Sequence, residues 1–69
     1  MKMSARNRFK GTVVELRPGA VNAVVKVDIG GGNIMTSVVT LEAIEELGLA
    51  VGKEAHVIVK ASEVMLGAD

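Results

Sequence analysis

The run AVNAVVKVDI, residues 20–29, alternates between apolar and polar side chains. A period of two places successive side chains on opposite faces of a strand. The odd-numbered residues of the run are all apolar, whereas the other face carries Asn22, Lys26 and Asp28. This run therefore predicts a strand with one buried face, and such a strand requires neighbouring strands.

Three further segments have the composition of strands, because they are rich in β-branched residues. They are residues 11–16 (GTVVEL), 34–40 (IMTSVVT) and 54–61 (EAHVIVKA). The segment 62–66 (SEVML) is expected to add a short fifth strand. Turns are predicted at Arg17-Pro18-Gly19 and at the glycine run 30–32 with Asn33.

Between the third and fourth expected strands, the apolar period changes to that of a helix. Leu41, Ile44 and Leu47 fall at helical spacing, while Thr40 and Gly48 are suitable caps. Three strands, one short helix and two more strands is the order of an OB-fold, a five-stranded Greek-key barrel. We therefore expect residues 1–69 to form one all-β domain of this OB-fold-like type. A small five-stranded sandwich or an SH3-like barrel is the alternative.

The chain has 69 residues, no cysteine and a single histidine, His56. A domain of this size buries only about 60% of its unfolded surface, so it usually needs disulfides, a metal or self-association. Disulfides are excluded, and one histidine without thiolates disfavours a structural zinc. Because 49% of the residues are hydrophobic, the sequence predicts self-association.

Several functional classes are disfavoured by the sequence. No apolar run approaches the ~20 residues that span a bilayer, and Met1–Ser4 lacks the pattern of a secretory signal, so a cytoplasmic location is expected. No nucleophile or carboxylate accompanies His56 at a recognisable spacing, so we expect no enzymatic activity. Single-stranded nucleic-acid binding remains the alternative function of an OB-fold. It normally requires a basic groove and aromatic platforms, whereas this chain has zero net charge and one aromatic residue, Phe9.

The opening segment MSARNRFKG, residues 3–11, holds three cations, and no carboxylate precedes Glu15. A deprotonated oxyanion only accepts hydrogen bonds, so its site should contain hydroxyls, backbone N–H groups, Arg and Lys. Residues 4–10 have this character, and so does the corner formed by Lys60, Ala61 and Ser62. The N-terminus of the expected helix offers further N–H groups. These features favour a small oxyanion as the ligand.

Four stretches cover most of the chain: SARNRFKGTVVEL, GAVNAVVKVDIGGGN, TSVVTLEAIEELGL and VGKEAHVIVKASEVML. Over residues 2–67 they resemble the molbindins, the small cytoplasmic Mop proteins of bacteria. The resemblance implies a homo-hexamer, built as a trimer of dimers, that binds molybdate or tungstate between subunits and has no catalytic cofactor. It implies intracellular molybdenum storage or homeostasis, and leaves delivery of molybdate to cofactor synthesis open.

The resemblance also implies which residues bind the oxyanion, with no separate metal ion. They are Ser4, Ala5, Arg6 and Asn7 of the opening, Thr40 and Leu41 at the helix start, and Lys60, Ala61 and Ser62 from a neighbouring copy. Arg6 and Lys60 would supply two positive charges, whereas Ala5, Leu41 and Ala61 would contribute backbone groups. Molbindins have a second type of site, for which the 19–22 loop is only a candidate.

Overall fold

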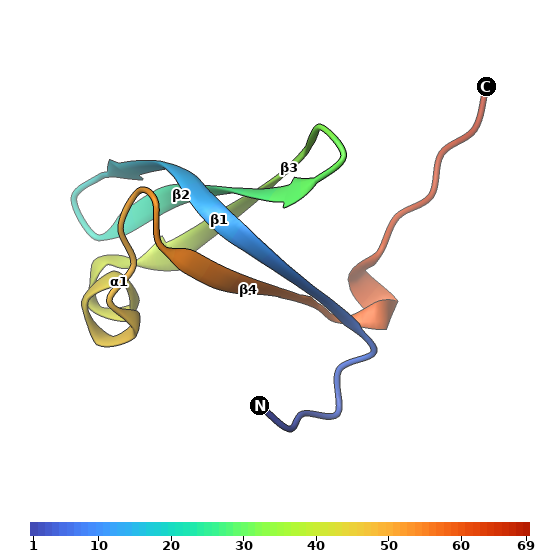
Figure 1. Ribbon diagram of the computed structural model, residues 1–69, viewed down its shortest axis with the longest axis horizontal. Coiled ribbons are helices and arrows are strands. Elements are labelled where there is room, and N and C mark those ends of the chain that lie inside the picture. The colour runs from blue at the N-terminus through green and yellow to red at the C-terminus, as the bar shows by residue number, and fades with distance from the viewer.

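The computed structural model describes residues 1–69 and consists of one curled antiparallel sheet with a short helix at one end (Figure 1). Its elements are β1 (Asn7–Pro18), β2 (Asn22–Gly30), β3 (Asn33–Thr40), α1 (Leu41–Leu47), β4 (Glu54–Val59) and the 3-10 helix η1 (Ala61–Glu63). The expected all-β class is confirmed, as is the position of the helix between the third and fourth strands. Neither α1 nor η1 has the length and the apolar character of a membrane-spanning helix.

The long strand β1 determines the order of the sheet, which is β3-β2-β1-β4. Its first half, Asn7–Thr12, pairs with β4, and its second half pairs with β2. The register with β2 shifts between Val13 and Glu15. Such a bulge bends a strand and increases its twist. At Gly11 a Cβ atom would meet the Asp28 carbonyl oxygen, so this close crossing requires glycine.

The prediction of five strands is wrong, because the structure contains four. Ala61–Glu63 forms η1, and the residues after it extend away from the sheet (Figure 1). The side chains of Met65 and Leu66 are 92% and 94% exposed. A strand needs a hydrogen-bonded neighbour, and this tail lies against neither edge of its own sheet. The outer edges of β3 and β4 are consequently unpaired within the chain.

The buried core is small and lies on the face predicted from the alternating run. Its four residues are Val13, Ala23, Val25 and Val27. Ile44 of α1 packs against this cluster, so the helix covers one end of the sheet. Four buried residues form a limited core for a chain with 49% hydrophobic residues. Much of the apolar surface is therefore left exposed in a single copy.

Both predicted caps of α1 are confirmed. The Thr40 hydroxyl accepts a hydrogen bond from the Ala43 backbone N–H at 3.0 Å. Gly48 ends the helix in the left-handed region, with φ of 64°. The backbone N–H of Leu41 donates to the Val21 carbonyl at 2.9 Å, which fixes the helix start beside the first residues of β2.

Candidate functional site

The antiparallel pairing of β1 and β4 brings the opening segment to the Lys60–Ser62 corner. Asn7 lies opposite Val59, so the residues just before β1 and just after β4 meet at one end of the sheet. They form an open depression of ≈ 660 Å³. It is lined by Ser4, Ala5, Arg6, Ile58, Lys60, Ala61 and Ser62. Six of the nine expected site residues therefore come together within one chain. The corner thus lies beside the opening segment of its own chain, and its contribution to the site of a neighbouring copy stays a prediction.

The side chains around this depression have the electrostatic character that an oxyanion requires. Arg6 and Lys60 are its cations, and no carboxylate lines it. Neither cation takes part in an ion pair of the chain. Ser4 and Ser62 add hydroxyl donors, and all four of these residues are exposed. The depression therefore has two uncompensated positive charges that face solvent.

The 3-10 turn holds the corner in place. The Glu63 backbone N–H donates to the Lys60 carbonyl at 2.9 Å, and that of Val64 donates to Ala61 at 3.3 Å. The first backbone N–H groups of a helical turn have no partner within the turn. The backbone N–H groups of Ala61 and Ser62 are thus available to a bound anion. A backbone contact from Ala61, which the resemblance implies, needs such a free N–H group.

Asn7 does not line the depression, although it was expected in the site. Its side chain is half-buried, and Nδ2 donates to the Val59 carbonyl oxygen at 3.2 Å. This bond joins the two strands directly beside the depression. The amide of Asn7 is therefore already engaged with the protein.

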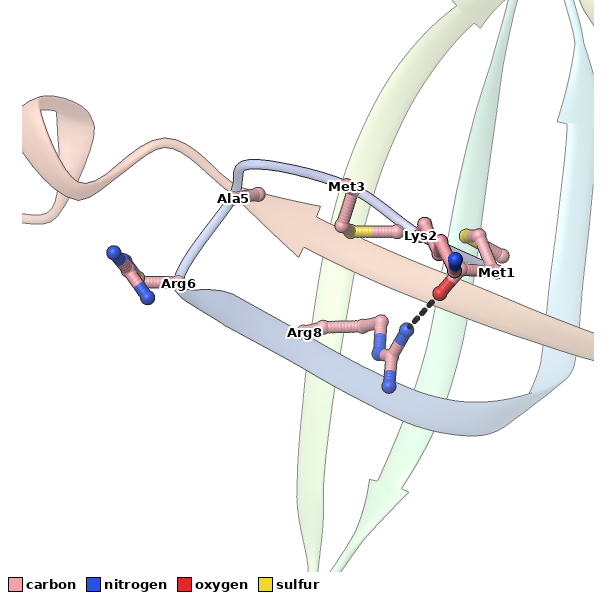
Figure 2. Close-up of a pocket in the computed structure, with 6 residues that line it drawn as sticks. All are labelled: Met1, Lys2, Met3, Ala5, Arg6 and Arg8. Atoms are coloured by element: carbon pink, nitrogen blue, oxygen red, sulfur yellow. Dashed lines mark hydrogen bonds between the residues drawn. The ribbon is translucent and has the colours of Figure 1, made fainter.

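Arg8 and Lys10, the other two cations of the opening segment, each have a partner elsewhere in the chain. Arg8 Nη1 donates to the Met1 carbonyl oxygen at 3.1 Å. Figure 2 shows this contact within a second depression beside the opening segment, which Met1, Lys2, Met3, Ala5, Arg6 and Arg8 line. Lys10 Nζ lies 3.5 Å from Glu54 Oε2.

Thr40 and Leu41 are not brought to the depression. Thr40 pairs with Asn22 at the end of the sheet where β1 finishes, whereas Asn7 begins β1 at the other end. Figure 1 shows α1 and η1 at opposite ends of the molecule. At about 3.3 Å per residue, roughly 36 Å of strand separates Asn7 from Pro18. One oxyanion cannot contact both groups in the same chain.

The one clearly shifted pKa lies away from the depression. Glu15 accepts a hydrogen bond from Arg17 at 2.7 Å, and Lys26 lies 3.9 Å from the same carboxylate oxygen. The bond from Arg17 and the charge of Lys26 hold the pKa of Glu15 below its usual value. This cluster belongs to the paired strands β1 and β2, so we assign it to stability.

Ile58 is the lining residue that the sequence-based site omitted. Its side chain is 50% exposed, and it lies two residues before Lys60. Strand periodicity places residues i and i+2 on one face, and this signal in the sequence identifies Ile58. An apolar side chain beside two cations reduces the water around them, which strengthens their interaction with an anion.

Comparison with known sequences shows that the chain is similar to proteins named for molybdenum-pterin binding. The TOBE domain profile matches residues 3–66. A probable molybdenum-pterin-binding protein of Haemophilus influenzae is 56% identical over 69 residues, which is 100% of both chains. Molybdenum-pterin-binding protein 2 of Clostridium pasteurianum is 47% identical over 66 residues, covering 96% of this chain and 97% of the relative.

Solved structures have the same fold. MopII from Clostridium pasteurianum has a TM-score of 0.91 at 46% identity, with 97% of this chain and 100% of that chain covered. The cytoplasmic molybdate-binding protein ModG, with molybdate bound, has a TM-score of 0.94 at 48% identity. That match covers 100% of this chain and 49% of ModG. With the full-length sequence matches, these structures show that the chain belongs to the Mop group of the TOBE domain family.

Proposed function

We propose that this protein binds molybdate, and also tungstate, as a homo-oligomer for intracellular molybdenum storage or homeostasis. The observation that carries the proposal is the depression with Arg6 and Lys60, two cations without an ion-pair partner, and with no carboxylate among its lining residues. The 48% identity to a molybdate-bound ModG supports the choice of oxyanion. ModG is described as cytoplasmic, which supports the same location for this protein.

The chemistry of the lining explains how a dianion would be held. Arg6 and Lys60 provide charge-assisted hydrogen bonds, which are shorter and stronger than neutral ones. The hydroxyls of Ser4 and Ser62 and the backbone of Ala61 provide neutral donors. Every oxygen of a deprotonated oxyanion is an acceptor, so each one matches this set. A protonated oxyanion carries an O–H donor, for which the lining offers no carboxylate.

We propose that the site is completed between subunits of a hexamer, arranged as a trimer of dimers. The exposed apolar surface of a single copy supports assembly, since Val21, Leu47 and Val51 are each more than 60% exposed. The unpaired sheet edges and the extended, apolar C-terminal tail support it further. In this assembly Thr40 and Leu41 of one copy would face the depression of another.

Calorimetric titration with molybdate, sulfate and phosphate, combined with native mass spectrometry, tests this function. We expect saturable binding of molybdate, weaker binding of phosphate, and a mass that corresponds to six chains plus bound oxyanion. Absence of a binding signal for molybdate, and for tungstate titrated in the same way, at millimolar concentration would overturn the proposed ligand. A monomer that binds molybdate would overturn only the proposed assembly.

A further inference from the structure

We propose that Asn7 is a positioning residue for the oxyanion site and does not itself contact the oxyanion. This inference rests on the proposed function, because it assigns a role to a residue beside the proposed site. Its side-chain amide would fasten the start of β1 to the end of β4. The bond would thereby hold Arg6 and Lys60 at the separation at which both reach one anion.

The pleat of the two strands places Asn7 on the opposite side from the depression. Successive residues of a strand point to opposite faces. The odd-numbered residues of this part of β1 share a face with Val13, which is fully buried. Asn7 is half-buried on that inner face, as is its partner Val59. Ile58 and Lys60 alternate with Val59 and line the depression, whereas Asn7 and Val59 do not.

The position of the hydrogen bond explains why it matters to the site. Asn7 and Val59 form the last pair of the β1–β4 ladder, with the residues 52 positions apart in sequence. Arg6 immediately precedes this pair, and Lys60 immediately follows it. Strand ends open more readily than strand centres. A side-chain bond at the terminal pair therefore restrains the two cations directly beyond it.

The chemistry of the amide agrees with this role. The side-chain amide of asparagine donates only through the two N–H groups of Nδ2, and its Oδ1 would repel a dianion. In the structure one N–H of Nδ2 donates to the Val59 carbonyl at 3.2 Å, and neither Asn7 nor Val59 lines the depression. Contact with the oxyanion would require the side chain to leave this bond and cross the sheet.

A double-mutant cycle separates positioning from direct contact. Molybdate affinity is measured by calorimetry for the wild type, Asn7→Ala, Lys60→Ala and the double variant. The loss of one net hydrogen bond corresponds to about a three- to tenfold loss of affinity. We expect a loss of this size for the single variant Asn7→Ala. In the Lys60→Ala background, the same change should alter affinity less than twofold, because the separation of Arg6 and Lys60 no longer matters once one of the two cations is absent.

Asn33→Ala is the matched control. Asn33 Nδ2 donates to the Gly30 carbonyl at 3.1 Å, so its replacement removes the same kind of bond from the β2–β3 hairpin. We expect both alanine variants to lower the thermal midpoint, and only Asn7→Ala to weaken molybdate binding. If Asn7→Ala fails to assemble, Asn7→Val replaces it in the cycle, because valine favours strands and suits a half-buried face.

Three results would overturn the inference. If the losses from Asn7→Ala and Lys60→Ala multiply in full, Asn7 contacts the oxyanion directly. If Asn7→Ala lowers the thermal midpoint without changing affinity, its bond is only structural. If Asn33→Ala weakens binding equally, the loss reflects general destabilisation. Failure of the wild type to bind molybdate would instead contradict the proposed function.

Discussion

Replacing Lys60 with alanine in the assembled protein should weaken molybdate binding about tenfold. A hydrogen bond to a charged group contributes about 1.5–3 kcal/mol, which corresponds to roughly a ten- to hundredfold change in affinity. Lys60 is exposed in the single chain, so solvent screens its charge and the lower end of this range applies. Arg6→Ala should produce a loss of at least the same size, because a guanidinium can donate two parallel bonds.

Arg8→Ala and Lys10→Ala are the matched controls, since each variant also removes one positive charge. Arg8 donates to the Met1 carbonyl and Lys10 lies beside Glu54, so neither faces the depression. We expect each control to change affinity less than threefold, through the long-range field alone. The difference between the two pairs of variants therefore reports the position of a charge rather than its presence.

The assay is calorimetric titration of the four single variants at one fixed ionic strength, with circular dichroism to confirm that each variant is folded. Equal and small losses in all four would refute the site, because a diffuse basic field would then be the only attraction. A large loss in Arg8→Ala with none in Lys60→Ala would move the site to the depression that contains Met1 and Arg8.

Three further predictions concern stability and partners. The thermal midpoint should rise with protein concentration, because association stabilises the folded chain; a folded monomer at micromolar concentration in sedimentation would contradict this. The pKa of Glu15 lies below its ordinary value of 4.5, so its stabilising contribution is complete above that value and is lost as the pH falls through the folded-state pKa. Urea unfolding between pH 7 and pH 3 should consequently show a weaker acid dependence in Glu15→Gln than in the wild type. Single-stranded oligonucleotides should not be retained at physiological ionic strength, whereas tight, salt-sensitive retention would favour the alternative nucleic-acid function.

Local features of the fold were predictable from the sequence because they depend on local chemistry. The alternation in residues 20–29 predicted the face that holds Val25 and Val27, and both are buried. The caps of α1 followed from the preference of threonine and glycine for helix ends, and both form as predicted. For the caps, the hydrogen bond that holds the helix end lies within a few residues of the residue that predicts it.

The fifth strand was not predictable in the same way. The segment 62–66 was expected to be a strand, but composition does not identify the edge that pairs with it. In the single chain its apolar side chains stay exposed, and only the turn Ala61–Glu63 is regular. A segment forms a strand only if it pairs with another strand, which is distant in sequence or belongs to another chain. The residues of the segment itself do not identify that pairing strand.

In the candidate site too, some features follow from local residue types and others depend on residues that are distant in sequence. Residue type alone indicated the donors of the opening segment and of the Lys60–Ser62 corner. Their meeting within one chain depends on the register between β1 and β4, 52 residues apart at the pair Asn7–Val59. The resemblance to molbindins implied that Asn7 binds the oxyanion, and the sequence does not show that its amide donates to the Val59 carbonyl.

The long strand β1 links these observations, because its two halves position the two ends of the sheet. The pairing of its first half with β4 places Arg6 beside Lys60. Its second half pairs with β2, and Val21, just before β2, accepts the hydrogen bond from Leu41 at the start of α1. Roughly 36 Å of strand separates these ends, at about 3.3 Å per residue. An oxyanion a few ångströms across that contacts both Arg6 and Leu41 must therefore lie between two copies of the chain. If the helix start does take part in binding, ligand binding and assembly are thermodynamically linked, and each must strengthen the other.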